Sequence, residues 1–163
     1  MIEIFLRFWC RWVIEMLGGL FRQRRARYDM SEDEKFYLMS CSDLLGEITP
    51  VIDGIGVMHD FFWEKISERK YEEEMQKCKE TAKSTLNEAE CIKAPERFKE
   101  MHDHFVKGLR YFEQSYTESK VYLSDKQREH IAEAIKLALL GSAELRDGNK
   151  QWERIKNETR VEG

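Results

Sequence analysis

The chain has 163 residues, of which 42% are hydrophobic and 36% are charged, with only two prolines and nine glycines. High charge, many helix formers and few helix breakers favour long amphipathic helices in one domain over a β-sheet. The formal charge of -4 argues against general nucleic-acid binding. We therefore predict an all-α, up-and-down antiparallel bundle of four to five long helices, formed by residues 1–163.

The first segment, residues 1–29, differs from the rest in its apolar pattern. Its polar residues recur every four positions, as Glu3, Arg7, Arg11 and Glu15. On a helix this spacing leaves one narrow polar stripe, and apolar side chains, Trp9 and Trp12 among them, cover the remaining surface. Met30 and Ser31 would make a good start for a soluble protein, so residues 1–29 are also a candidate for an element that is separable from the bundle.

The same segment differs in charge, because a basic run closes it. The run consists of Arg22, Arg24, Arg25 and Arg27. Residues 1–30 hold six arginines against Glu3, Glu15 and Asp29, a net charge of +3, which leaves -7 for residues 31–163. A basic patch on an acidic body fits an anionic lipid surface or an acidic partner better than it fits DNA.

Two interpretations of this segment remain open. In one, a helix from about residue 2 to 27 is buried in the bundle or between two copies, with its charges paired along the exposed stripe. In the other, it lies in a membrane interface with the arginines near anionic headgroups. Charges at Arg7, Arg11 and Glu15 break the apolar run, so neither an export signal nor a transmembrane span is predicted. We expect a cytoplasmic protein, with membrane association as the second interpretation.

Residues 31–90 are predicted to form a long kinked helix or two helices. Ser31 and Glu34 have the spacing of a capping box. Apolar residues follow at helical spacing, at Tyr37, Cys41, Leu44, Ile48, Val51, Ile55, Met58, Phe62 and Ile66. Pro50 lacks a backbone donor and predicts a kink. The rings of residues 61–63 fan around the helix, so Phe61 and Trp63 are candidate interaction residues beside the N-terminal segment.

Residues 95–157 are predicted to form a helical hairpin. Its first helix carries an apolar seam that includes Phe98, Phe105 and Phe112, and Ser124 to Gln127 match a second capping box. The small residues Ala138, Gly141 and Ser142 predict a close approach of the neighbouring helix. His102 and Asn149 are polar residues on the two seams, and they are candidates to specify register by meeting across the hairpin. The stretch resembles helical hairpins of small bacterial proteins, a resemblance that implies no particular function.

The motifs that carry chemistry are missing. No histidine follows a glutamate by three positions, so no di-metal pair of that kind is present, and Glu100 with His104 has no second pair. There is no nucleophile elbow or phosphate-binding loop. The four cysteines lie far apart, which favours reduced, apolar roles. The sequence therefore predicts no catalytic residue, no cofactor and no metal.

We expect a non-catalytic interaction or regulatory module that binds an unidentified protein partner or itself. The interaction elements are the N-terminal helix and the adjoining aromatic surface. The alternative is a peripheral membrane protein anchored through the same helix.

Overall fold

The computed structural model describes residues 29–160, so the expected helix over residues 2–27 lies outside the described part. The elements in chain order are α2 (Glu32–Glu47), α3 (Thr49–Phe62), α4 (Glu68–Cys91), the 3-10 turn η1 (Glu96–Phe98), α5 (Lys99–Asp125) and α6 (Arg128–Thr159). Between residues 29 and 160 the chain is helical and holds no strand. The predicted all-α fold class is confirmed.

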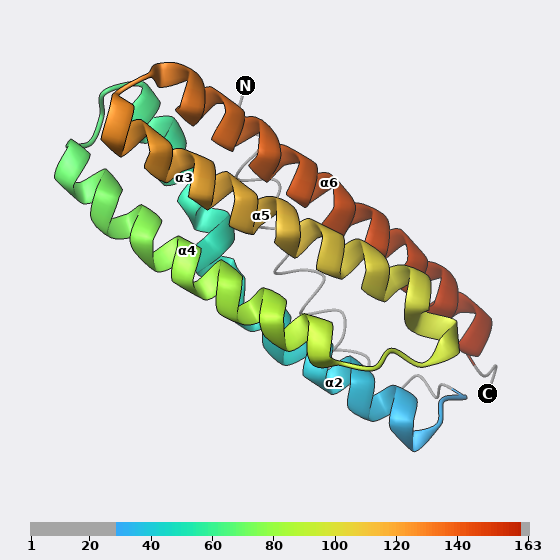
Figure 1. The fold of residues 1–163 in the computed structure, drawn as a ribbon. Helices are drawn as coiled ribbons and strands as arrows, with labels where there is room; N and C mark the ends of the chain where they lie inside the picture. The colour runs from blue at the N-terminus through green and yellow to red at the C-terminus, as the bar shows by residue number, and fades with distance from the viewer. Residues whose placement is uncertain (1–28, 161–163) are drawn as a thin grey trace.

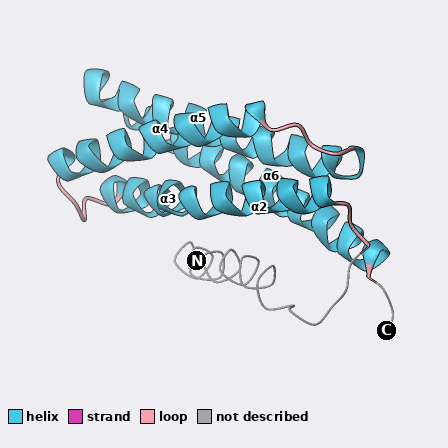
Figure 2. Ribbon diagram, turned by 90° about the horizontal axis from the view of Figure 1, so that it is seen from below, coloured by secondary structure: helices cyan, strands magenta, loops and turns pink. Residues whose placement is uncertain are grey.

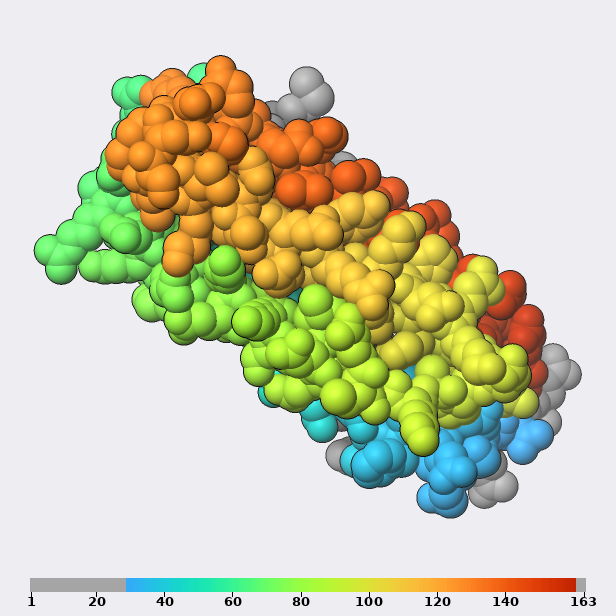
Figure 3. All heavy atoms as spheres, in the orientation of Figure 1, coloured from blue at the N-terminus to red at the C-terminus, as the bar shows by residue number. Residues whose placement is uncertain are grey.

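The helices lie along one another in an elongated molecule (Figure 1). α5 and α6 run side by side, and α4 packs along α5, so that their atoms meet over much of one face (Figure 3). α2 and α3 follow one another in a layer beneath α4 and α5 (Figure 2). α3 packs against α4 and α6, whereas α2 packs mainly against α4 and α3.

Local sequence signals account for α2 and α3. The predicted capping box is confirmed, because Ser31 Oγ accepts from the Glu34 N–H at 3.2 Å and the Glu34 carboxylate accepts from the Ser31 N–H at 2.8 Å. α2 ends at Glu47, and Pro50 lies in the first turn of α3, where its missing N–H costs little. The predicted spacing matches the core as far as Met58, whereas Phe62 and Ile66 are only half-buried. The buried residues are Tyr37, Cys41, Leu44, Ile48, Val51, Ile55 and Met58.

Small residues bring α5 and α6 together. A Cβ atom added at Gly141 would lie 2.9 Å from the carbonyl oxygen of Gly108. The hydroxyl of Ser115 donates to the carbonyl of Ala134 at 2.7 Å, so residues 108 and 115 face residues 141 and 134 in an antiparallel hairpin. The close approach predicted at Gly141 is confirmed.

The second predicted capping box is wrong. α5 continues through Asp125, and Lys126 ends it in the left-handed conformation with φ 61°. α6 then begins after Gln127, which makes no side-chain cap. The carboxylate of Asp125 instead accepts from the Gln127 N–H at 3.0 Å. Residues 124–127 have the composition of a capping box, but they do not form one because a residue in the left-handed conformation makes the tight turn.

His130 ties this turn to α5 with two carboxylates. Its Nδ1 lies 2.5 Å from Glu118 Oε1, and its Nε2 lies 2.8 Å from Asp125 Oδ2. The hydrogen bond with Glu118, followed by the interactions with Asp125, raises the pKa of His130 above its ordinary value of 6.5. The imidazole, when protonated, therefore holds the two ends of the hairpin turn.

We expect His130→Gln to reduce the melting temperature most at low pH. A histidine whose folded pKa is raised contributes its full stabilisation below the unfolded value, near 6.5, and loses it as pH rises through the folded value. Melting curves of both proteins between about pH 5.5 and pH 9 should therefore converge at the alkaline end. Lys136→Gln, which removes an exposed charge from α6, is the control. A difference that stays constant across this range would contradict the assignment.

Candidate functional site

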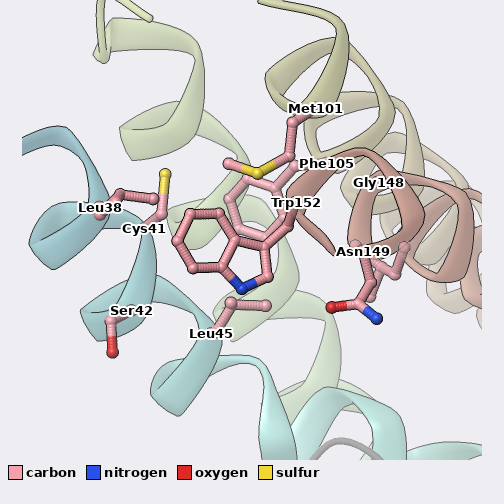
Figure 4. Close-up of a pocket in the computed structure, with 10 residues that line it drawn as sticks. Leu38, Cys41, Ser42, Leu45, Met101, Phe105, Gly148, Asn149 and Trp152 are labelled. Atoms are coloured by element: carbon pink, nitrogen blue, oxygen red, sulfur yellow. The ribbon is translucent and has the colours of Figure 1, made fainter. Parts of the chain in front are cut away.

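A groove of about 60 Å³ lies between α2 and the α5–α6 hairpin (Figure 4). Most of its lining is apolar. The lining residues are Leu38, Cys41, Ser42 and Leu45 from α2, Met101 and Phe105 from α5, and Leu145, Gly148, Asn149 and Trp152 from α6. We refer to these ten residues as the α2–α6 groove, and it is the candidate functional site.

The helix repeat explains why α2 presents a second apolar edge here. Tyr37 and Leu44 face the core, and Leu38 and Leu45 each follow a core residue by one position, so they lie about 100° further around the helix. Leu38 and Leu45 remain half-buried. α2 therefore uses one face for the bundle and offers an adjacent one to the groove.

The hairpin closes the opposite wall of the groove tightly. A Cβ atom added at Gly148 would lie 3.2 Å from the Cβ of His104 and 3.3 Å from the carbonyl oxygen of Met101. α5 and α6 thus leave no space between them at this level. Because α2 packs mainly on α4 and α3, the space between α2 and α6 stays open.

Asn149 places one unsatisfied polar atom in this apolar setting. Its Oδ1 is buried and has no hydrogen-bond partner. Figure 4 shows the oxygen on the side of the amide that faces α2. A buried acceptor without a donor costs about 1–3 kcal/mol. A molecule that fills the groove and donates a hydrogen bond here would remove that cost.

Trp152 lies between the groove and a neighbouring cluster of core residues. The indole lies between α2 and α6 in Figure 4, and its ring stacks on Phe98 with centroids 6.4 Å apart. Phe98 belongs to a small core cluster with Tyr37, Cys41 and Ile155. One side of Trp152 is thus fixed by packing, while the other lines the groove.

His102 lies beside this cluster and has its own partners. The Tyr37 hydroxyl forms a hydrogen bond with His102 Nδ1 at 3.2 Å, and the ring also bonds to the backbone of Ala89. Burial lowers the pKa of His102, so the neutral ring is favoured. The histidine fixes α2 against α4 and α5. The predicted contact between His102 and Asn149 does not form, because Asn149 faces the groove instead.

The predicted aromatic surface divides into a packed and an exposed part. Phe61 stacks on Tyr71 with centroids 4.1 Å apart and meets Tyr122 edge-on at 5.3 Å, so it belongs to the packing of α3. The side chain of Trp63 is 62% exposed, and its ring centroid lies 6.4 Å from that of His59. Phe61 is in the last turn of α3 and Trp63 directly follows it, and this end of α3 points away from α2 (Figure 1). They do not join the groove.

The remaining candidate interaction residues are in the N-terminal segment. They are Trp9, Trp12, Arg22, Arg24, Arg25 and Arg27, and all lie outside the described residues. Sequence reasoning identified Asn149 as a polar seam residue but missed Leu38 and Leu45. The only signal for these two was an apolar residue directly after a core position, which is common in buried helices.

Polar clusters elsewhere form ion pairs. His104 and Lys107 lie 2.8 Å and 2.5 Å from the carboxylate of Glu144. Desolvation raises the pKa of Glu144, but hydrogen bonds from Lys107 and His104 outweigh it and lower the pKa overall. Over residues 29–160, no group of three histidine, cysteine or acidic side chains is placed to hold a metal ion. Within the same range, no helix has the length and apolar character needed to cross a membrane.

Comparisons with known proteins do not extend this description. No family model, curated protein or solved structure matches the chain.

The cysteines provide a test of the burial around the groove. Cys41 lines the groove and Cys78 lies against the Pro50 carbonyl; burial raises the pKa of both thiols to about 11, whereas Cys91 is exposed. In a Cys10→Ser chain at about pH 8, a thiol reagent should modify Cys91 quickly. Cys41 and Cys78 should react only after denaturation. Loss of the fast phase in Cys10→Ser/Cys91→Ser is the control, and three equally fast thiols in the native protein would contradict the structure.

Proposed function

We propose that the protein is a non-catalytic helical interaction module that binds an apolar helix in the α2–α6 groove. The observation that carries the proposal is the buried, unpaired Oδ1 of Asn149 within an apolar lining. An apolar helix can cover Leu38, Leu45 and Trp152 together. The helix would come from a protein partner or from a copy of this chain.

The geometry favours a helix over an extended peptide or a small polar ligand. The groove runs between two helices, and each offers apolar residues seven positions apart, Leu38 with Leu45 and Leu145 with Trp152. Seven residues are about two turns, or roughly 10 Å. This is the arrangement that accepts residues at helical spacing from an amphipathic helix. The buried acceptor adds a requirement for one donor on the apolar face.

The proposal includes the finer architecture expected from the sequence. In an up-and-down bundle with a bend near Pro50, the direction of α2 differs from that of α3. Such a bend would carry α2 away from α6 while α3 stays packed against it, which is consistent with the contacts of these helices. The groove would then follow directly from the position of the proline.

A second candidate function is peripheral membrane binding through residues 1–27. It is favoured by the apolar pattern of this segment and by the arginines between residues 22 and 27. Co-flotation of the full chain with anionic and with neutral vesicles tests it. Flotation restricted to anionic vesicles at low salt supports the membrane function, and no flotation with either contradicts it.

Photo-cross-linking within the full chain tests the interaction function. A benzophenone amino acid at Leu45 faces the groove, and the same group at Met39, which is 66% exposed on another face of α2, is the control. We expect adducts with an apolar helical segment from position 45 and far fewer from position 39. Adducts from neither position, or equally from both, would show that the groove is not a binding site.

A further inference from the structure

We propose that the first occupant of the α2–α6 groove is the chain's own segment, residues 2–21, and that any partner helix competes with it. The inference rests on the proposed function, since it takes the groove to be a helix-binding site. It adds the identity of the helix.

The place where the described chain begins supports this occupant. The N–H of Asp29 donates to the carbonyl of Thr159 at 2.9 Å, and Arg97 donates to the carbonyl of Asp29 at 3.3 Å. Met30 packs on the cluster around Phe98, which also contacts Trp152. The segment before residue 29 is therefore attached at the C-terminal end of α6, next to the boundary of the groove.

The distances along the chain allow the segment to reach the groove. Trp152 precedes Thr159 by seven residues on α6, about 10 Å, and Asn149 precedes it by ten, about 15 Å. Residues 22–28 span up to about 23 Å when extended. They therefore allow residue 21 to lie near Thr159, which would place Trp12, about 13 Å further along a helix, beside Asn149. Tethering also raises the local concentration of the segment to about millimolar, above that of a second copy in dilute solution.

The chemistry of the segment matches that of the groove. On the helix that the sequence predicts, Trp9 and Trp12 are three positions apart and share a face. An indole N–H is a donor carried on an apolar ring, and it is the type of group that the unpaired Oδ1 of Asn149 requires. The arginines between residues 22 and 27 would pass the C-terminal end of α6 and the acidic first turn of α2, where Glu32 and Asp33 are exposed.

A spin label on Cys10 of the full chain tests the inference. The Cys91→Ser variant leaves Cys10 as the only reactive thiol outside the buried pair Cys41 and Cys78. With the nitroxide attached, we expect the amide signals of Leu45 and Trp152 to lose most of their intensity. Signals from the start of α4, at Glu72 and Glu73, should keep theirs. The loss should disappear in Trp12→Asp/Leu17→Asp and persist in Arg11→Gln, which alters only the polar stripe.

A mixing experiment separates the possible occupants. Spin-labelled chains are mixed with isotope-labelled chains that carry no nitroxide, so that only contacts between molecules broaden signals. Broadening of Leu45 in the mixture would mean that a second copy occupies the groove, which overturns the intramolecular inference and leaves the proposed function intact. No broadening in either sample also overturns the inference. In that case cross-links from position 45 to another protein would preserve the proposed function. Their absence would contradict both the inference and the proposed function.

Discussion

Gly141→Ala is expected to lower the free energy of unfolding by about 2 kcal/mol, whereas Gly46→Ala is expected to raise it by about 1 kcal/mol. Both glycines lie inside α-helices, so both substitutions gain helix propensity. Their surroundings differ. The new Cβ at Gly141 would lie 2.9 Å from the backbone oxygen of Gly108 and 3.3 Å from the ring of Phe112, while the one at Gly46 meets nothing within 4 Å.

The sign of the effect at Gly141 depends on what must move. A flexible side chain could turn away from a new methyl group, but a carbonyl oxygen can withdraw only if α5 and α6 separate. That separation would loosen the packing of buried residues along the hairpin, including Ser115 and Ala134. Overpacking of this kind costs about 1–3 kcal/mol, more than the gain in helix propensity.

Denaturation in urea checks this pair of substitutions. Each variant is compared with the parent chain by circular dichroism at neutral pH, and the slope of the transition is required to stay unchanged. Opposite signs at the two glycines are the expected result. A stabilising effect at Gly141 would show that the hairpin helices are further apart than the structure has them.

The fold follows from the sequence where the signal for it is local. The start of α2 was predictable because a capping box is a local signal, fully contained in Ser31 and Glu34. The core spacing from Tyr37 to Met58 was predictable because a helix repeats. Lys126 shows the limit of such signals, since its left-handed conformation ends α5 where composition predicted a cap.

The candidate site could not be predicted because it depends on distances between helices. Nothing near Leu38 or Leu45 in the sequence states how far α2 lies from α6. Asn149 was identified as a seam residue that requires a partner, but the expected partner was wrong. His102 bonds to Tyr37, which is 65 positions away, and Asn149 is left facing the groove. Sequence spacing indicates which face of a helix a residue occupies, but it does not indicate which other helix that face contacts.

Gly54→Ala is expected to lower the free energy of unfolding by about 2 kcal/mol, and this loss should shrink when Tyr116 is replaced by phenylalanine. A Cβ at Gly54 would lie 2.7 Å from Cys78 Sγ and 2.7 Å from the hydroxyl oxygen of Tyr116. The tyrosine cannot turn away, because it is fully buried and donates a hydrogen bond to the carbonyl of Val51. Glycine is therefore required where α3 approaches Cys78 of α4 and Tyr116 of α5.

A double-mutant cycle separates this contact from a general loss of packing. Tyr116→Phe alone should cost about 1 kcal/mol, the usual value of one hydrogen bond, because the Val51 carbonyl belongs to the helix ladder. Phenylalanine removes the hydroxyl that the new methyl group meets, so the double variant should lose about 1 kcal/mol less than the sum of the single losses. Gly46→Ala with Tyr116→Phe is the matched control and should be additive. If Gly54 and Tyr116 also behave additively, their contact does not position α3, and other residues must hold it against α4.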